Sequence, residues 1–234
     1  MMKSYEYYDR IAYMYDEMYN NKKWLTLRKA VEHYMDKTIN MKNARVLDIG
    51  SGTGYWLEYF LNKGFSVYAL EPSSKMIEFA KERFKDKVKY FNTTIENFVT
   101  DNKFDILNIQ GDVLSYVENL DLVMKKISNI INKDGLLFAT VDSYYYMRKL
   151  VKKYGNSREM EIFEKYHITT VGSQYGIFNS KCFTLEDIKE LEKYGFQVLE
   201  IRGCGYSDNL EEEIEKSYNI VLGEHIYFSL RYLK

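Results

Sequence analysis

A run of three glycines at alternate positions constrains the fold of this chain more than any other feature of its sequence. An apolar stretch, residues 44–49, leads into Gly50, Gly52 and Gly54, and an amphipathic segment, residues 55–62, follows. Because glycine adopts the backbone angles that a tight turn needs, this order predicts a buried strand, a sharp turn and a helix. The first turn of such a helix offers free N–H groups and the positive end of the helix dipole to a ligand.

Strands and helices alternate through the middle of the chain, which predicts an α/β fold with a largely parallel sheet and helices on both of its faces. Near-continuous apolar runs such as residues 106–109 fit strands that are buried on both faces. Thr184 and Asp187 have the spacing of a capping box, and Gly195 ends the helix that they begin. The expected strands are residues 44–49, 65–70, 88–92, 104–109, 136–141, 196–201 and 225–232, and the expected helices between them are residues 55–63, 73–84, 120–132 and 184–194.

The composition is that of a single globular domain spanning residues 1–234. Of these residues, 46% are hydrophobic and 29% are charged, which is enough for one substantial core. The formal net charge of −1 gives no overall field that would favour nucleic acid or an anionic membrane. No apolar run reaches the roughly 18 residues of a membrane-spanning helix. Cys182 and Cys204 form neither a ligand cluster nor a disulfide framework, so we expect a cytoplasmic protein.

Two segments fall outside the regular alternation and are expected to form a small lid over the ligand. Residues 1–38 predict a helical cap before the first strand, and residues 143–182 form an insertion too long for an ordinary connection. Within that insertion we expect two helices and a hairpin, at residues 143–153, 158–165 and 167–181. Segments that follow the carboxyl ends of parallel strands tend to cover the ligand crevice. The alternatives are that both segments only extend the fold or that they mediate dimerisation.

The glycine run, with Asp48 two residues before Gly50, resembles motif I of the class I S-adenosylmethionine (SAM) dependent methyltransferases. The rival dinucleotide fingerprint would need a Gly or Ala where this chain has Tyr55. An acid at position 48 would also repel a pyrophosphate and attract a cationic amino-acid tail. The resemblance covers about residues 5–205. It implies a Rossmann-like, seven-stranded mixed sheet whose last strand is antiparallel, with SAM as cofactor and S-adenosylhomocysteine as product.

The same resemblance implies roles for residues that follow the other strands. Glu71, after the second strand, would accept hydrogen bonds from the ribose hydroxyls, and Met76 of the E-P-S-x-x-M pattern would lie near the adenine. Thr94 stands where the family often has an adenine-binding Asp, and Glu96 or the backbone of Ile95 are the alternatives. The expected cofactor-binding residues are Tyr8, Tyr15, Asp48, Gly50, Ser51, Gly52, Gly54, Glu71, Pro72, Met76, Thr94, Ile95 and Gln110.

The acceptor site is less defined by the sequence. Transfer from SAM is an in-line displacement that alignment and water exclusion can promote, and a hydroxyl or carbon acceptor would also need a general base. No metal site is expected, because the three histidines, at positions 33, 167 and 225, are scattered along the chain. The candidate bases are His167, Asp112, Asp142 and Glu164, and Tyr116 is a further catalytic candidate. The expected substrate-binding residues are Tyr116, Tyr144, Tyr145 and His167.

These observations favour a SAM-dependent methyltransferase that acts on an N, O or C nucleophile of a small molecule, as a monomer or homodimer. An RNA or protein methyltransferase is the second hypothesis. The near-zero charge and the absence of an Asn/Asp-Pro-Pro-Tyr sequence after the fourth strand disfavour methylation of nucleic-acid bases. A non-catalytic SAM-binding protein is the third hypothesis, which the lack of an acid at Thr94 supports.

Overall fold

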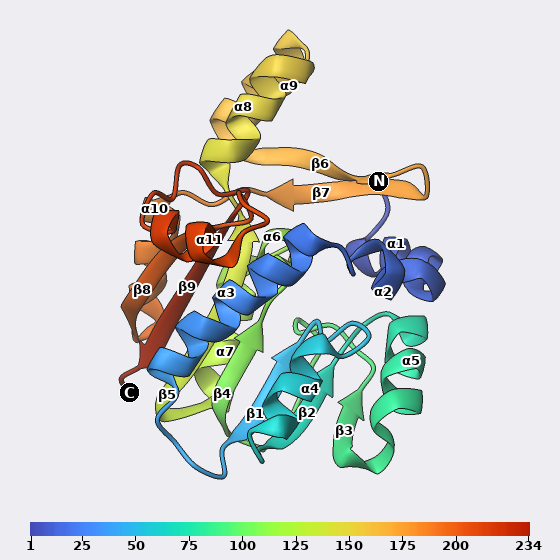
Figure 1. Ribbon diagram of the computed structural model, residues 1–234, viewed down its shortest axis with the longest axis vertical. Helices are drawn as coiled ribbons and strands as arrows, with labels where there is room; N and C mark the ends of the chain where they lie inside the picture. The colour runs from blue at the N-terminus through green and yellow to red at the C-terminus, as the bar shows by residue number, and fades with distance from the viewer.

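A seven-stranded sheet organises the computed structural model of residues 1–234 (Figure 1). The strand order is β3-β2-β1-β4-β5-β9-β8, and only β9 runs antiparallel to its neighbours. The α/β fold expected from the sequence, with a mixed sheet and an antiparallel last strand, is therefore confirmed. The strands of this sheet are β1 (Arg45–Ile49), β2 (Ser66–Leu70), β3 (Val88–Phe91), β4 (Phe104–Ile109), β5 (Ile131–Asp142), β8 (Phe196–Cys204) and β9 (His225–Tyr232).

Helices cover both faces of the sheet, and side chains cap several of them. Ser73 accepts a hydrogen bond from the Met76 N–H at the start of α5, and Asn119 accepts one from the Leu122 N–H at the start of α7. No helix has both the length and the apolar character needed to cross a membrane. The helices are α1 (Ser4–Ile11), α2 (Tyr15–Met18), α3 (Lys22–Thr38), α4 (Tyr55–Asn62), α5 (Ser74–Phe84), α6 (Val113–Tyr116), α7 (Leu120–Ile130), α8 (Tyr144–Tyr154), α9 (Ser157–Tyr166), α10 (Leu185–Lys189) and α11 (Leu210–Lys216), with 3-10 turns at Ala12–Met14, Lys85–Lys87 and Glu190–Tyr194.

Two apolar layers hold the helices against the sheet. In β1, Val46 packs in the layer that contains α3 and α4, whereas Leu47 and Ile49 pack in the layer that contains α7. Alternate residues of one strand thus enter opposite layers, as the period of a strand requires. This two-sided burial explains why the central strands are apolar almost throughout.

The structure corrects some expected boundaries. Helix α7 ends at Ile130, and β5 begins at Ile131, five residues before the expected start of this strand. A register shift in the pairing of β4 with β5 and the positive φ of Asp134 mark an irregular stretch that reads as a turn in the sequence. The expected helix 184–194 is α-helical only as far as Lys189 and ends as a 3-10 turn at Tyr194. Helices α6 and α11 were not anticipated.

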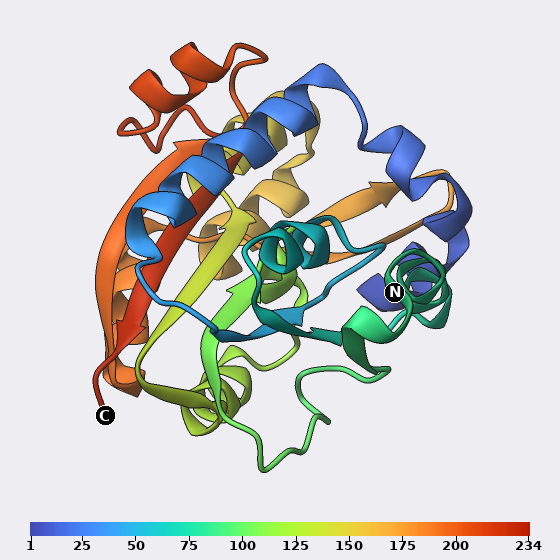
Figure 2. The same ribbon diagram turned by 60° about the horizontal axis from the view of Figure 1, so that its bottom comes forward.

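The N-terminal helices and a two-stranded hairpin meet beyond the carboxyl ends of the parallel strands (Figures 1 and 2). The hairpin consists of β6 (Ile168–Ser173) and β7 (Gly176–Lys181), close to its expected place. The Tyr7 hydroxyl of α1 donates to Ser173 Oγ at 3.0 Å. Tyr7 and Phe178 also belong to a small apolar cluster that includes Met76 of α5. The two segments outside the regular alternation therefore pack on each other.

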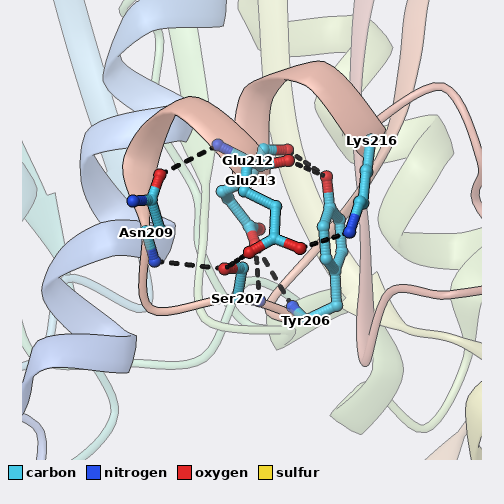
Figure 3. Close-up of polar contacts among 6 residues, drawn as sticks. All are labelled: Tyr206, Ser207, Asn209, Glu212, Glu213 and Lys216. Carbon is cyan, nitrogen blue, oxygen red and sulfur yellow. Dashed lines mark hydrogen bonds and ion pairs between the residues drawn. The ribbon is translucent and has the colours of Figure 1, made fainter.

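A buried carboxylate closes the connection between β8 and β9. Glu213 of α11 accepts hydrogen bonds from the backbone N–H groups of Gly205, Tyr206 and Ser207, at 2.5, 3.2 and 2.9 Å. Figure 3 shows the bonds from Tyr206 and Ser207. Both of its oxygens are thereby satisfied by the protein itself, as buried polar groups usually are. This loop leads into α11, which precedes β9 in the chain.

The apolar layers supply a test of the fold. Phe138 on β5 is fully buried, whereas Phe79 on α5 is 40% exposed. We expect Phe138→Ala to lower the free energy of unfolding by about 3–5 kcal/mol, because it removes a buried ring and leaves a cavity. Phe79→Ala, the matched control, should cost less than about 1 kcal/mol. Denaturant unfolding of both variants measures the difference, and equal losses would contradict the assigned core.

Candidate functional site

A cavity of about 920 Å³ opens where the parallel strands end. The strand order reverses between β1 and β4, and ligands of open α/β sheets bind at such a switch point. The volume lies at the upper end of the range of about 300–1,000 Å³ typical of ligand sites, so there is room for two small molecules side by side. The walls come from the turns after β1 to β5, from the N-terminal helices and from the β6–β7 hairpin.

The glycine-rich turn forms one wall of the cavity. A side chain at Gly52 would meet no atom within 4 Å, so its surface is open to a ligand. A side chain at Gly54 would instead lie 2.3 Å from the Phe84 ring, so this glycine is required for packing. Both residues have positive φ, which favours glycine. The turn is thus shaped both to approach a ligand and to pack on α5.

Glu71 ties the glycine turn to the end of β2. Its carboxylate accepts hydrogen bonds from the Gly52 N–H at 2.9 Å and from the Ser73 N–H at 2.8 Å. The residue is buried, and burial raises the pKa of its carboxyl to about 7. Each carboxylate oxygen has a second lone pair, so Glu71 can still accept hydrogen bonds from a ligand in the cavity.

Several buried polar atoms near the turn lack a partner in the protein. Asp48 accepts a hydrogen bond from the Asn108 amide at 2.7 Å through one oxygen, whereas its other oxygen has none. Ser51 Oγ and Gln110 Oε1 are likewise buried and without a partner, and both residues line the cavity. Since buried polar groups are normally paired, these atoms indicate a polar ligand. Asp48 itself lies behind the turn and does not line the cavity.

The N-terminal helices are anchored beside the same turn. Asp9 accepts hydrogen bonds from Ser73 Oγ at 2.5 Å and from the Lys75 N–H at 3.2 Å. Thr53 of the turn donates a hydrogen bond to Asp16. Asp9 and Asp16 therefore anchor the N-terminal helices to the turn. The neighbouring Tyr8 and Tyr15 line the cavity.

Three charged side chains gather at the cavity where β4 and β5 end and β9 begins. His225 Nδ1 lies 2.9 Å from Asp112 Oδ2 and 3.7 Å from Asp142 Oδ1, and all three residues are buried. Burial alone would lower the pKa of His225, but the two carboxylates outweigh it and raise the value to about 9. Burial and the Asp112 charge raise the pKa of Asp142 to about 7. At neutral pH the cluster therefore contains an imidazolium between two acids.

The role of His225 was missed in the sequence, although a signal was present. In the structure, the strands that correspond to the expected residues 136–141 and 225–232 pair antiparallel. The first residue of the second strand therefore lies beside the last residue of the first strand. In the structure Asp142 and His225 are direct register partners of β5 and β9. The histidines are scattered along the chain, but His225 meets two aspartates, and the ligand atoms of this group all lie within 4.8 Å of one another.

The cavity brings together most of the predicted site residues. It is lined by every expected cofactor-binding residue except Asp48, namely Tyr8, Tyr15, Gly50, Ser51, Gly52, Gly54, Glu71, Pro72, Met76, Thr94, Ile95 and Gln110. Tyr116, Asp112 and Asp142 line it too. Tyr19, Trp24 and Phe178 also line it and were not anticipated as site residues.

Four expected acceptor-site residues lie outside the cavity walls. Tyr144 stacks on Phe163 and donates a hydrogen bond to Glu164 at 3.0 Å, because α8 and α9 pack on each other. His167 Nδ1 lies 3.6 Å from Asp187. The Tyr145 hydroxyl accepts a hydrogen bond from the Leu185 N–H at 3.3 Å. The expectation that Tyr144, Tyr145 and His167 line the acceptor pocket, and that His167 or Glu164 acts there as a base, is not supported by this placement.

Comparison with known proteins gives a family match. A family model described as a methyltransferase domain matches residues 20–201 of the chain. The ubiquinone biosynthesis O-methyltransferase of Pelagibacter ubique is 30% identical over 117 residues, which are 49% of this chain and 46% of that enzyme. The chain thus aligns with less than half the length of this relative. An uncharacterised protein of Methanocaldococcus jannaschii is 27% identical over 237 residues, 98% of this chain and 90% of that protein.

Among solved structures, a SAM-dependent methyltransferase from Clostridium acetobutylicum superposes with a TM-score of 0.66. The alignment covers 97% of this chain and 99% of that one, at 18% sequence identity. A likeness at this identity establishes that the two chains share a fold.

The buried Asp48 carboxyl supplies a pH-dependent stability test. Its pKa is raised from 3.8 to about 7, so ionisation costs the folded state stability, and the free energy of unfolding falls as the pH rises through this interval. We expect Asp48→Asn to raise the melting temperature at pH 8, by the equivalent of a few kcal/mol at ~1.4 kcal/mol per pKa unit. The difference in melting temperature between Asp48→Asn and the parent should shrink as the pH approaches 4.

The control for this test is Asp121→Asn, because Asp121 is exposed and pairs with Lys125, which lowers its pKa. This variant should show no gain at pH 8. A melting temperature for Asp48→Asn below that of the parent at pH 8 would contradict the assigned burial cost.

Proposed function

Because the chain belongs to the methyltransferase domain family, we propose that its cavity holds SAM beside a small-molecule acceptor and that a methyl group passes between them. The observation that carries the proposal is that one cavity joins the glycine turn, Glu71 and the charged cluster. The first two are suited to a cationic nucleoside, and the third offers polar groups in the same cavity for an acceptor.

The residues present fit SAM. Gly52 leaves open space beside the turn, and the unpartnered oxygens of Ser51 and Gln110 offer hydrogen-bond acceptors to the amino-acid portion. The Asp48 carboxyl behind the turn would add negative charge that attracts a cation. Glu71 would accept hydrogen bonds from the ribose, and Met76 with Ile95 would enclose the adenine. Both Thr94 and Glu96 line the cavity and remain alternatives for the adenine contact. When bound, SAM supplies a methyl group activated by a sulfonium.

The chain's own part in the reaction is to orient the acceptor and to exclude water. An in-line displacement gains most from alignment of the reacting groups, and a closed site strengthens the electrostatic contacts within it. Helix α1 and the β6–β7 hairpin, joined by the Tyr7 and Phe178 contacts, would cover the cavity as a lid. Tyr8, Tyr15 and Tyr116 line the enclosed space and would surround the acceptor.

A dissolved small molecule is the acceptor class that fits best. The cavity lies beneath the N-terminal helices and the hairpin, and the formal net charge of −1 provides no basic surface for RNA. The Pelagibacter relative is named as an O-methyltransferase of ubiquinone biosynthesis, which supports a small acceptor without identifying it. In this proposal the enzyme acts in the cytoplasm as a monomer or homodimer. Salt-dependent RNA binding, or SAM binding without transfer to any acceptor, would instead favour the two alternative functions.

The glycine turn provides the first test of the cofactor assignment. We expect Gly52→Val to abolish SAM binding in calorimetry, because the new side chain would enter the open space beside the turn. Gly64→Val is the matched control: Gly64 also has positive φ and open surroundings but does not line the cavity. Both variants carry the same backbone strain, and the control should keep the parent's affinity.

If folded Gly52→Val binds SAM with unchanged affinity, the assignment of the cofactor site is wrong. The assignment is also wrong if, in a thermal-shift measurement, NAD stabilises the parent protein but SAM and S-adenosylhomocysteine do not.

The raised pKa of Glu71 predicts how SAM binding depends on pH. Since its carboxyl titrates near 7 and the ionised form is the better acceptor for ribose hydroxyls, SAM affinity should rise between pH 6 and pH 8. Glu71→Gln should weaken binding at pH 8 by about 1–3 kcal/mol, the scale of a lost charge-assisted hydrogen bond. Its affinity should also depend less on pH. An affinity that does not change with pH in the parent would contradict the role of Glu71.

A further inference from the structure

Asp112 differs from the buried acids that serve the fold. Glu213 and Glu71 accept backbone hydrogen bonds through both carboxylate oxygens. Asp112 Oδ2 contacts only His225, and its Oδ1 is buried without any partner. Its backbone has a φ of 61°, which is uncommon for a residue other than glycine. A strained, buried and half-satisfied carboxylate is costly, so it indicates a ligand with hydrogen-bond donors.

The cavity end around Asp112 carries excess negative charge. Two carboxylates face one imidazolium, which leaves a net charge of about −1 when all three are ionised. The basic side chains of the cavity are engaged elsewhere: Lys181 pairs with Asp187, and Arg28 lies over the Tyr55 ring. Glu224, next to His225, is paired with Lys23 at 2.6 Å. The other titratable groups that face the cluster are Tyr8, Tyr15, Tyr19, Tyr116, Cys182 and Cys204.

Aromatic rings surround this acidic end. Tyr8, Tyr19, Trp24 and Tyr116 all line the cavity, and the Trp24 ring lies 5.4 Å from the His225 ring. Aromatic faces attract organic cations, and the attraction grows when water is excluded. Carboxylates within an aromatic wall therefore match an ammonium group that carries apolar substituents.

We propose that Asp112, Asp142 and His225 form the acceptor subsite, which binds an organic amine as its ammonium ion and removes the proton that blocks methylation. This inference rests on the proposed function and names the substrate class for the same cavity. Asp112 holds the ammonium, His225 holds the Asp112 side chain in place, and Asp142 takes the proton.

The proton step balances within the site. An N–H bond of the ammonium breaks and the proton passes to an Asp142 oxygen, which leaves a neutral amine with a free lone pair. That pair forms the new N–C bond while the methyl carbon's bond to sulfur breaks, and its electrons stay on sulfur. Asp142 titrates near pH 7, closer to an amine than an ordinary aspartate, so it is a better matched base.

Two other roles for the cluster fit less well. A hydroxyl is a much weaker acid than an ammonium ion, so Asp142 is poorly matched to it as a base, and the two carboxylate neighbours of His225 keep the imidazole protonated at neutral pH. A divalent cation would find two carboxylates and one imidazole, but hard cations prefer further oxygen ligands and water to the aromatic walls present here. Both roles become outcomes of the test below.

The first experiment measures binding, not turnover. The protein saturated with S-adenosylhomocysteine is titrated in a calorimeter with 2-phenylethylamine and with its neutral analogue 2-phenylethanol, at pH 6 and pH 8. We expect the amine to bind in preference to the alcohol, and more tightly at pH 8, where Asp142 is ionised. Preferential binding of the alcohol, or no amine binding at millimolar concentration, would overturn the proposal.

Variants separate the subsite from the cofactor site. Asp142→Asn and Asp112→Asn should each weaken amine binding about tenfold or more while the affinity for S-adenosylhomocysteine stays within about twofold. Asp121→Asn, at an exposed acid of α7 that does not line the cavity, should change neither. If the parent fails to bind S-adenosylhomocysteine, the proposed function fails. If it binds this product but the variants bind the amine as the parent does, only the subsite fails.

NMR titration of the histidines gives a readout that a structural role would not move. The His225 signal, assigned by its loss in His225→Gln, should titrate near pH 9 in the free protein. Added 2-phenylethylamine should lower that pKa, since a second cation then shares the carboxylates, and Asp112→Asn should lower it without any ligand. A His225 pKa unaffected by the amine, or a shift produced by manganese chloride at micromolar concentration in place of the amine, would overturn the proposal.

Discussion

The hydrogen bond from the Gly52 N–H to the Glu71 carboxylate is the contact on which the site depends. It joins the turn after β1 to the end of β2, two neighbouring parallel strands, and β1 borders the switch point between β1 and β4. Because the same carboxylate also receives the Ser73 N–H at the start of α5, one buried acid orients the glycine turn and the next helix. The position of the cavity wall follows from this single residue.

Several acidic side chains are buried in or beside the cavity. Asp48, Glu71 and Asp142 all titrate near pH 7 because each lies in a poorly hydrated place. Buried carboxylates reduce the stability of the protein when no ligand is bound. When a cation binds beside them, they lower the free energy of the complex. In the proposed function, this loss of stability accompanies recognition of a cation in the cavity. Glu213, whose hydrogen bonds are all made within the protein, is by contrast a structural buried acid.

Local patterns predicted most of the fold and located the glycine turn and Glu71, which line the cavity. The glycine turn and the acid after β2 are encoded by residues close in sequence, so they could be located without coordinates. The charged cluster joins residues from three separate strand ends, and only the pairing of β5 with β9 brings Asp142 beside His225. The packing of α8 on α9, which takes Tyr144 away from the cavity, also depends on tertiary contacts that no local pattern contains.

A crystal structure of the protein with S-adenosylhomocysteine tests the central claim most directly. The account predicts the ribose hydroxyls within hydrogen-bond distance of Glu71, the amino-acid portion against the glycine turn, and the sulfur directed toward Asp112 and Asp142. A product molecule bound elsewhere, or a glycine turn that contacts only protein side chains in the complex, would contradict it.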